Sequence, residues 1–233
     1  MYTPTNSKKG YAMGVIPGGE CESAMSVVVF DLETDSKIRD APGCTREEQV
    51  KNLQFSCCSC LSIDVEAINR GDAPDVLVEA GVMKTYWRDR KEDIEAMLAL
   101  FEEATAIVGF NTFWFDFLVL RKHYKDKQMF HRHLFKSLDV FSRVRDVASH
   151  WPKLDSLLKR NGLACKTADG LEAIKWFAEG RLDELKSYCE ADVRCCARLV
   201  LSNEMIVDAP GVGSITIPGH VFNIQGFLKS MSA

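Results

Sequence analysis

The sequence lacks any long hydrophobic run. No apolar stretch in its 233 residues approaches the ~20 residues needed to cross a bilayer. Residues 1–19 are polar and glycine-rich, without the hydrophobic segment of a secretory signal. We therefore expect no membrane partner. A hydrophobic content of 46% and a charged content of 27% are typical of a globular protein with a substantial core.

The sequence also lacks the pattern of a disulfide framework or a zinc site. Nine cysteines, an odd number in irregular positions, indicate reduced thiols in an intracellular compartment, the cytoplasm or the nucleus. Cys57 and Cys60 have the Cys-x-x-Cys spacing, but no second such pair or paired histidine segment supplies the remaining zinc ligands. They lie in an apolar run, so we interpret them as small hydrophobic residues. The same interpretation applies to Cys189, Cys195 and Cys196.

An excess of positive charge, common in nucleic-acid-binding domains, is absent: the formal net charge is −4. Local basic groups matter more than the total, and bound metal ions would add positive charge of their own. The densest basic group comprises residues 121–127, His131-Arg132-His133 and Lys136. This group fits a nucleic-acid contact and equally fits a solvated helix end with its loop.

The pattern of apolar residues predicts one α/β domain over residues 26–205. Short apolar runs at 26–32, 53–61 and 81–87 favour three consecutive antiparallel strands. Further strands are expected at 106–110 and 134–140, and helices at 91–104, 114–124, 154–162, 171–178 and 182–201. We expect residues 1–25 to form a flexible tail. Residues 206–233 are expected to form an extension, packed as a hairpin around Pro218-Gly219 or as a loose strand.

Acidic residues in three separate motifs are the most informative feature of the chain. Asp31 and Glu33 end a buried apolar strand, and their side chains point the same way because strand side chains repeat every second residue. Tyr188 and Asp192 lie four residues apart, so on a helix they share one face. Asp116 follows the expected strand at 106–110. Carboxylates gathered from distant segments repel one another unless cations neutralise them, and their hard oxygen atoms suit Mg²⁺ or Mn²⁺.

These segments resemble the three exonuclease motifs of the DnaQ-like 3′–5′ exonucleases, the DEDD group within the ribonuclease H-like fold. The first motif is Asp31-Leu32-Glu33-Thr34, and the second runs from Asn111 to Phe115-Asp116. The third runs from Tyr188 to Asp192. Tyr188 stands four residues before the final acid, which resembles the tyrosine branch (DEDDy) of the group. Residues 180–193 are similar to stand-alone exonucleases related to the proofreading domain of B-family DNA polymerases.

The resemblance implies a fold, an activity and a set of site residues. The fold would be ribonuclease H-like, a mixed β-sheet with helices on both faces. The activity would be hydrolysis of terminal phosphodiesters at single-stranded 3′ ends to nucleoside 5′-monophosphates, with two divalent metal ions, Mg²⁺ or Mn²⁺. Asp31 would bridge the ions, Glu33 and Asp192 would ligate mainly one, and Asp116 would support the other. Tyr188 would orient the attacking water, since a phenol with a pKa near ~10 is a poor base at neutral pH.

Three further residues are weaker candidates for substrate binding: Thr34, Asn111 and Trp114. Asn111 is close to the substrate strand in the family, although asparagine also commonly caps loops and helices. Trp114 belongs to an aromatic cluster with Phe113 and Phe115, of which we expect two rings to be core and one to be exposed enough to stack on a base.

Two other functions remain open at this point. A binding module that kept the fold and lost the chemistry is one, and a ribonuclease H-like endonuclease or resolvase is the other. The intact acids argue against the first, and the position of Tyr188 disfavours the second. The expected partner is DNA or RNA with a free 3′ end, and the choice between these polymers is open. Protein partners in replication, repair or RNA processing are compatible with the sequence.

Overall fold

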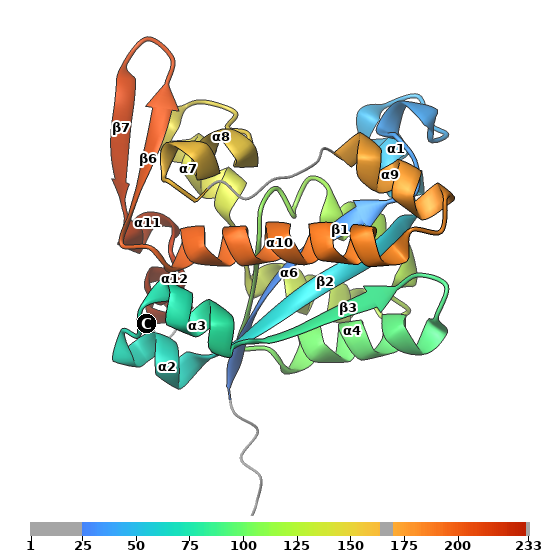
Figure 1. The fold of residues 1–233 in the computed structure, drawn as a ribbon, viewed down its shortest axis with the longest axis horizontal. Helices are drawn as coiled ribbons and strands as arrows, with labels where there is room; N and C mark the ends of the chain where they lie inside the picture. The colour runs from blue at the N-terminus through green and yellow to red at the C-terminus, as the bar shows by residue number, and fades with distance from the viewer. Residues whose placement is uncertain (1–24, 164–169, 232–233) are drawn as a thin grey trace, which may run out of the picture.

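A five-stranded mixed sheet forms the centre of the computed structural model, which describes residues 25–163 and 170–231 (Figure 1). The tail expected at residues 1–25 lies almost wholly outside the described residues. The strand order is β3-β2-β1-β4-β5, with β1 antiparallel to β2 and parallel to β4. The strands are β1 (Ser26–Thr34), β2 (Phe55–Asp64), β3 (Val82–Trp87), β4 (Ala106–Gly109) and β5 (Ser137–Asp139). The first three strands form the predicted antiparallel meander.

Helices cover both faces of this sheet. In chain order they are α1 (Arg46–Asn52), α2 (Val65–Arg70), α3 (Pro74–Ala80), α4 (Lys91–Glu103), α5 (Asp116–Leu120), α6 (Lys127–Phe135), α7 (Val140–Ala148), α8 (Leu154–Arg160), α9 (Gly170–Ala178), α10 (Leu182–Leu201), α11 (Gly219–Phe222) and α12 (Ile224–Met231). Short 3₁₀ turns follow β1 at Ile38–Asp40 (η1) and α5 at Arg121–His123 (η2). The predicted fold class, a mixed sheet with helices on both faces, is confirmed.

The alternation of side chains along β1 assigns each face its core. Val27 and Val29 belong to the apolar cluster shared with α10, α7 and α8. Val28 and Phe30 belong to the cluster shared with α4 and α5. Because strand side chains repeat every second residue, Asp31 and Glu33 project on the same face as Val27 and Val29, the face that α10 covers.

Helix α10 is the longest element, and it crosses this face of the sheet in contact with β1 and β2 (Figure 1). One end lies beside α9, and the other lies beside a terminal hairpin. The hairpin consists of β6 (Glu204–Ala209) and β7 (Gly213–Pro218), which pair antiparallel. Its turn lies at residues 210–212, so the prediction that a hairpin turns at Pro218-Gly219 is wrong. Gly219 instead begins α11.

A second expectation also differs from the structure. The run at residues 134–140 was expected to be a strand, but α6 extends to Phe135 and β5 comprises three residues. Asp126 caps α6, because its carboxylate accepts the backbone N–H groups of Gln128 and Met129.

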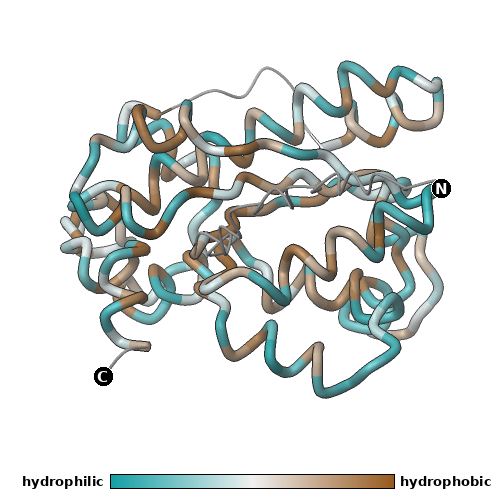
Figure 2. Tube along the Cα trace, turned by 90° about the horizontal axis from the view of Figure 1, so that it is seen from below, coloured by the Kyte–Doolittle hydropathy of each residue, from teal (hydrophilic) through white to brown (hydrophobic). Residues whose placement is uncertain are grey.

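The hydropathy of the chain follows these layers. Hydrophobic segments gather toward the interior where the strands run, and hydrophilic segments lie mainly along the outer turns of the helices (Figure 2). Within the described ranges, no helix is both long enough and apolar enough to span a bilayer.

Candidate active site

The fold brings three of the predicted acids together. Carboxylate oxygen atoms of Asp31, Glu33 and Asp192 all lie within 4.8 Å of one another. Asp31 and Glu33 reach this point from the end of β1, and Asp192 reaches it from the sheet-facing side of α10. The sequence periodicities of 2 and 3.6 residues are therefore what bring these acids to one place.

Asp192 occupies a position in the apolar stripe of α10. Its neighbours on the stripe, Leu185, Cys189, Cys196 and Leu199, are all buried, and Asp192 itself is only 4% exposed. A carboxylate in such a stripe is costly unless a cation or hydrogen-bond donors compensate its charge. Its position beside Asp31 and Glu33 adds electrostatic repulsion, which a bound cation would relieve.

Asp116 lies nearby but outside that group of three. It begins α5 and is 2% exposed, and its Oδ1 atom has no hydrogen-bond partner. Burial raises the pKa of this carboxyl well above its usual range, and the charge of Asp31 raises it further. The backbone of Leu32 hydrogen-bonds to the carboxyl and opposes this rise. Asp116 is thus a buried acid with an unused oxygen atom beside the acidic cluster.

Asp139 fastens the loop that carries Asp116. It is buried at the end of β5, and its carboxylate accepts the backbone N–H groups of Asn111, at 2.7 Å, and Phe113, at 3.4 Å. The same carboxylate accepts the Ser142 hydroxyl at 3.0 Å and caps α7. Asn111 has a left-handed backbone with φ of 64°, which asparagine tolerates better than most residues. Sequence reasoning assigned Asp139 no catalytic role, although an aspartate between a strand and a helix is a typical N-cap.

Tyr188 lies one helical turn from Asp192, in a small apolar cluster with Cys57, Leu185 and Cys189. It is 5% exposed, and its ring meets Trp176 edge to face with centroids 5.8 Å apart. The phenol is therefore firmly positioned by packing. Beneath it, the Cys189 thiol contacts the carbonyl oxygen of Asp31 at 3.5 Å, which links α10 directly to the end of β1.

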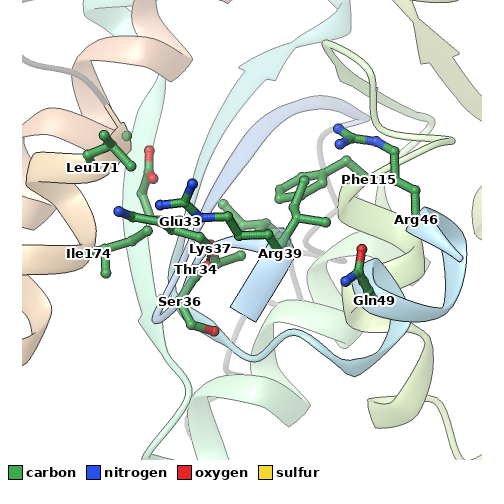
Figure 3. A pocket seen from close by; sticks show the side chains of 13 residues that line it. Glu33, Thr34, Ser36, Lys37, Arg39, Arg46, Gln49, Phe115, Leu171 and Ile174 are labelled. Atoms are coloured by element: carbon green, nitrogen blue, oxygen red, sulfur yellow. Dashed lines mark hydrogen bonds between the residues drawn. The ribbon is translucent and has the colours of Figure 1, made fainter. Parts of the chain in front are cut away.

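A pocket of about 730 Å³ adjoins the acidic cluster at Glu33 (Figure 3). Its size lies within the roughly 300–1,000 Å³ typical of small-molecule sites. The apolar part of its wall comes from Leu32, Ile38, Phe115, Leu171 and Ile174. Thr34 lines the floor, and its hydroxyl donates to the carbonyl oxygen of Ser36 at 3.0 Å.

Three cationic side chains line the same pocket: Lys37, Arg39 and Arg46. Lys37 and Arg39 point toward its Glu33 end, whereas Arg46 lies at the opposite end near Phe115 (Figure 3). Cations next to a carboxylate cluster suit a ligand that carries a phosphate group, because the phosphate is attracted both to these side chains and to any metal ion held by the acids.

Asn111 and Trp114 line a second pocket, together with Arg46 and Trp151. Trp114 is 57% exposed. Phe113 and Phe115 pack against the core, and the Phe113 ring stacks on Phe117. Of the three aromatic residues before Asp116, two are therefore partly buried against the core and one is exposed.

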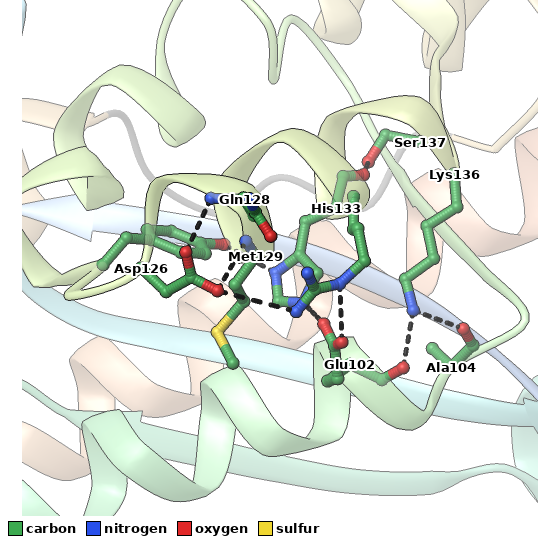
Figure 4. A network of polar contacts seen from close by, with 10 residues as sticks. Glu102, Ala104, Asp126, Gln128, Met129, His133, Lys136 and Ser137 are labelled. Atoms are coloured by element: carbon green, nitrogen blue, oxygen red, sulfur yellow. Dashed lines mark hydrogen bonds and ion pairs between the residues drawn. The ribbon is translucent and has the colours of Figure 1, made fainter.

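The last part of the basic group, which comprises Arg132, His133 and Lys136, is bound to the protein itself (Figure 4). Arg132 and His133 both contact the Glu102 carboxylate, at 2.8 and 2.7 Å. The Lys136 ammonium donates to the carbonyl oxygens of Glu102 and Ala104. These contacts join α6 to α4. For these three residues they favour a structural role over a nucleic-acid contact.

The cysteines divide between the two sheet faces. Cys58 and Cys60 belong to the core beneath α4, whereas Cys57 faces α10. Six described cysteines are free thiols: Cys44, Cys57, Cys58, Cys60, Cys189 and Cys196. Cys195 is disulfide-bonded, so the expectation of reduced thiols is wrong at that position.

The donor set fits a divalent metal ion. Asp31, Glu33 and Asp192 offer carboxylate oxygen atoms at one point, and Asp116 has an unbonded oxygen beside Asp31. Hard oxygen ligands of this kind suit Mg²⁺, Mn²⁺ or Ca²⁺. Of the residues that the structure describes, this is the one group of three or more acids, histidines or cysteines able to share an ion.

Comparison with known proteins finds similarity in structure but not in sequence. No protein-family model and no characterised protein's sequence matches the chain. The structure is similar to exonuclease I in complex with the inhibitor BCBP, with 14% identity and a TM-score of 0.41, over 72% of this chain and 44% of that one. It is similar to the zinc-bound E. coli exonuclease I–ssDNA complex, with 15% identity and a TM-score of 0.38, over 70% and 42%. It is also similar to exonuclease I from Methylocaldum szegediense, with 14% identity and a TM-score of 0.37, over 70% of this chain and 42% of that one. The chain spans less than half the length of each of these proteins.

Proposed function

We propose that the chain is a metal-dependent 3′–5′ exonuclease acting on single-stranded DNA or RNA ends. The observation that carries this proposal is the meeting of Asp31, Glu33 and Asp192 within 4.8 Å, half-buried to buried, against a pocket with a cationic wall. Mutual repulsion among three adjacent carboxylates opposes folding. Divalent ions bound there for phosphodiester hydrolysis would offset that repulsion.

In this proposal Asp31, Glu33, Asp116 and Asp192 hold the divalent ions, Mg²⁺ or Mn²⁺. The ions would supply Lewis acidity toward the attacking water and the departing 3′ oxygen. The four carboxylates supply the negative charge that keeps the ions in place. Asp116 gains the most from them, because burial and the charge of Asp31 disfavour its ionised form.

The remaining site residues bind and orient the reacting groups. Tyr188 is rigidly packed one turn from Asp192 and orients the water by hydrogen bonding rather than by removing its proton. Lys37 and Arg39 attract the phosphate that is cut, and Thr34 lines the floor under the terminal nucleotide. Water adds to phosphorus, the bond from phosphorus to the 3′ oxygen breaks, and a nucleoside 5′-monophosphate leaves.

The pocket supports attack at an end rather than within a strand. It has room for a group the size of a nucleotide, and a terminal nucleotide enters such a pocket more easily than one joined on both sides. The matching experiment compares linear and circular single-stranded DNA of the same sequence, in Mg²⁺ and in Mn²⁺. We expect release of mononucleotides from the linear form alone, and none with Asp31→Ala. Cutting of the circle would mean an endonuclease, and the exonuclease proposal would then be wrong.

A further inference from the structure

Two exposed tryptophans line one pocket beside the proposed catalytic site. Trp114 is 57% exposed and Trp151 is 68% exposed, and both line a cavity of about 490 Å³. Phe141, Leu118 and Val50 add apolar surface to it. Exposed indole rings gathered at one cavity are unusual for a protein surface and are typical of a binding site.

The Trp151 ring and the backbone beside Trp114 are held in position despite the exposure of both side chains. The Trp151 ring packs on Phe141, with centroids 5.5 Å apart, and the Arg145 guanidinium lies 5.7 Å from its centroid. Trp114 belongs to the loop that Asp139 fastens through the backbone N–H groups of Asn111 and Phe113. A ring that is fixed before binding loses little conformational entropy when a ligand stacks on it.

Arg46 connects this cavity to the catalytic pocket, because it lines both. It is the first residue of α1, whose start is fixed by the capping box of Thr45 and Glu48. The two cavities therefore adjoin, with a cation at their boundary. A single strand whose scissile phosphate lies at the Glu33 end of the first pocket can extend past Arg46, so that an earlier phosphate would lie near Arg46 and earlier bases beside the tryptophans.

We propose that Trp114, Trp151 and Arg46 form a stacking platform for the unpaired nucleotides that precede the 3′-terminal one. This inference rests on the proposed exonuclease function, and it names single-stranded nucleic acid as the substrate. Aromatic faces bind bases of any sequence by stacking, and a neighbouring arginine binds the backbone. Paired bases expose only their edges, so a duplex end has to unpair before it uses this platform.

Direct binding measurement tests the platform. Fluorescence anisotropy of a labelled dT10 oligonucleotide would be followed with Asp31→Asn protein in Mg²⁺, so that substrate is not consumed. Stacking of one base contributes roughly 5- to 150-fold to affinity, so adding Trp151→Leu is expected to raise Kd about tenfold. Trp151→Phe keeps an aromatic face and is expected to restore most of the affinity. Phe135→Leu, at an 86% exposed aromatic on α6, is the matched control and should leave Kd unchanged.

Length dependence separates stacking from a general effect on the fold. The dinucleotide pTpT reaches less of the platform, so Trp151→Leu should weaken its binding by less than it weakens dT10. Equal weakening of both, or a Kd for dT10 within twofold of the parent, overturns the platform. If the parent binds dT10 through Trp151 but wild-type protein degrades no DNA or RNA, the exonuclease proposal is wrong and the platform stands. If the parent binds only protein partners and no oligonucleotide, both proposals are overturned.

Discussion

Replacing Asp116 by asparagine is expected to stabilise the metal-free protein while disabling the proposed enzyme. Asp116 is 2% exposed, its Oδ1 atom has no hydrogen-bond partner, and burial and the charge of Asp31 raise its pKa. Asparagine has nearly the same shape and keeps one acceptor oxygen for the backbone of Leu32, but it removes the buried charge. The substitution therefore relieves a destabilising interaction at neutral pH.

The size of the effect follows from the environment of Asp116. A buried group without a partner costs about 1–3 kcal/mol, and more when it is charged, so exchanging the charged carboxylate for a neutral amide is expected to gain an amount of this order. For a chain of this length each kcal/mol shifts Tm by about 2–4 °C, so a rise of about 2–12 °C is expected at pH 7 in EDTA. The direction of the pKa shift of Asp116 also sets how the stability of the protein depends on pH. Because the folded-state pKa lies above the unfolded value of 3.8, wild-type stability is lost as pH rises through the folded-state pKa. The advantage of Asp116→Asn should accordingly vanish below about pH 4.

Calorimetry or thermal unfolding followed by circular dichroism measures this directly, with and without Mn²⁺. Wild-type protein should gain stability from Mn²⁺, because a ligand that binds only the folded state raises Tm. Asp116→Asn should gain much less, and Asp89→Asn, at a side chain 71% exposed, should behave like wild type. A lower or unchanged Tm for Asp116→Asn in EDTA at pH 7 would show that the buried charge is not a source of strain.

Three further predictions concern activity and pH. Tyr188→Phe keeps the packing against Trp176 and should lower the cleavage rate about 10²-fold, with the Mn²⁺-dependent gain in Tm preserved; loss of that gain would place the phenol among the metal ligands. Lys37→Ala and Arg39→Ala should each weaken oligonucleotide binding and reduce the slope of log K against log salt by about one, and an unchanged slope would exclude a phosphate contact. Burial lowers the pKa of His133, against the opposing effect of Glu102, so its stability contribution is complete above the unfolded-state pKa of about 6.5 and is lost as pH falls. Urea unfolding from pH 7.5 to 5.5 should show a smaller loss of stability for His133→Gln than for wild type.

Helices and strands with a strong hydrophobic periodicity could be predicted from the sequence. The alternation in β1 and the apolar stripe of α10 predict both their type and their orientation, and these two elements carry Asp31, Glu33 and Asp192. The side chains that meet across this interface follow from the periods of 2 and 3.6 residues. The cluster of Asp31, Glu33 and Asp192 is therefore the part of the molecule where the local sequence pattern predicts the tertiary arrangement.

Other features depend on contacts that a linear pattern does not contain. The basic residues of α6 could equally bind nucleic acid or protein, and the choice depends on Glu102, which lies 31 residues before His133. The run at residues 134–140 fits a strand or the end of a helix, and the structure divides it between the last residues of α6 and the three residues of β5. Trp114 follows β4 and Trp151 follows α7, and the two line one pocket only because the chain folds back so that Trp151 packs on Phe141.

The central claim is tested most directly by the products formed from 5′-labelled single-stranded DNA and RNA oligonucleotides of one sequence. Purified protein would be incubated with each in Mg²⁺ or Mn²⁺, with EDTA and Asp31→Ala as controls. The account predicts a metal-dependent ladder that shortens from the 3′ end and is absent in both controls, and the relative rates would identify the preferred polymer. Intact oligonucleotides in every condition would contradict the account, since the acidic cluster would then serve binding rather than hydrolysis.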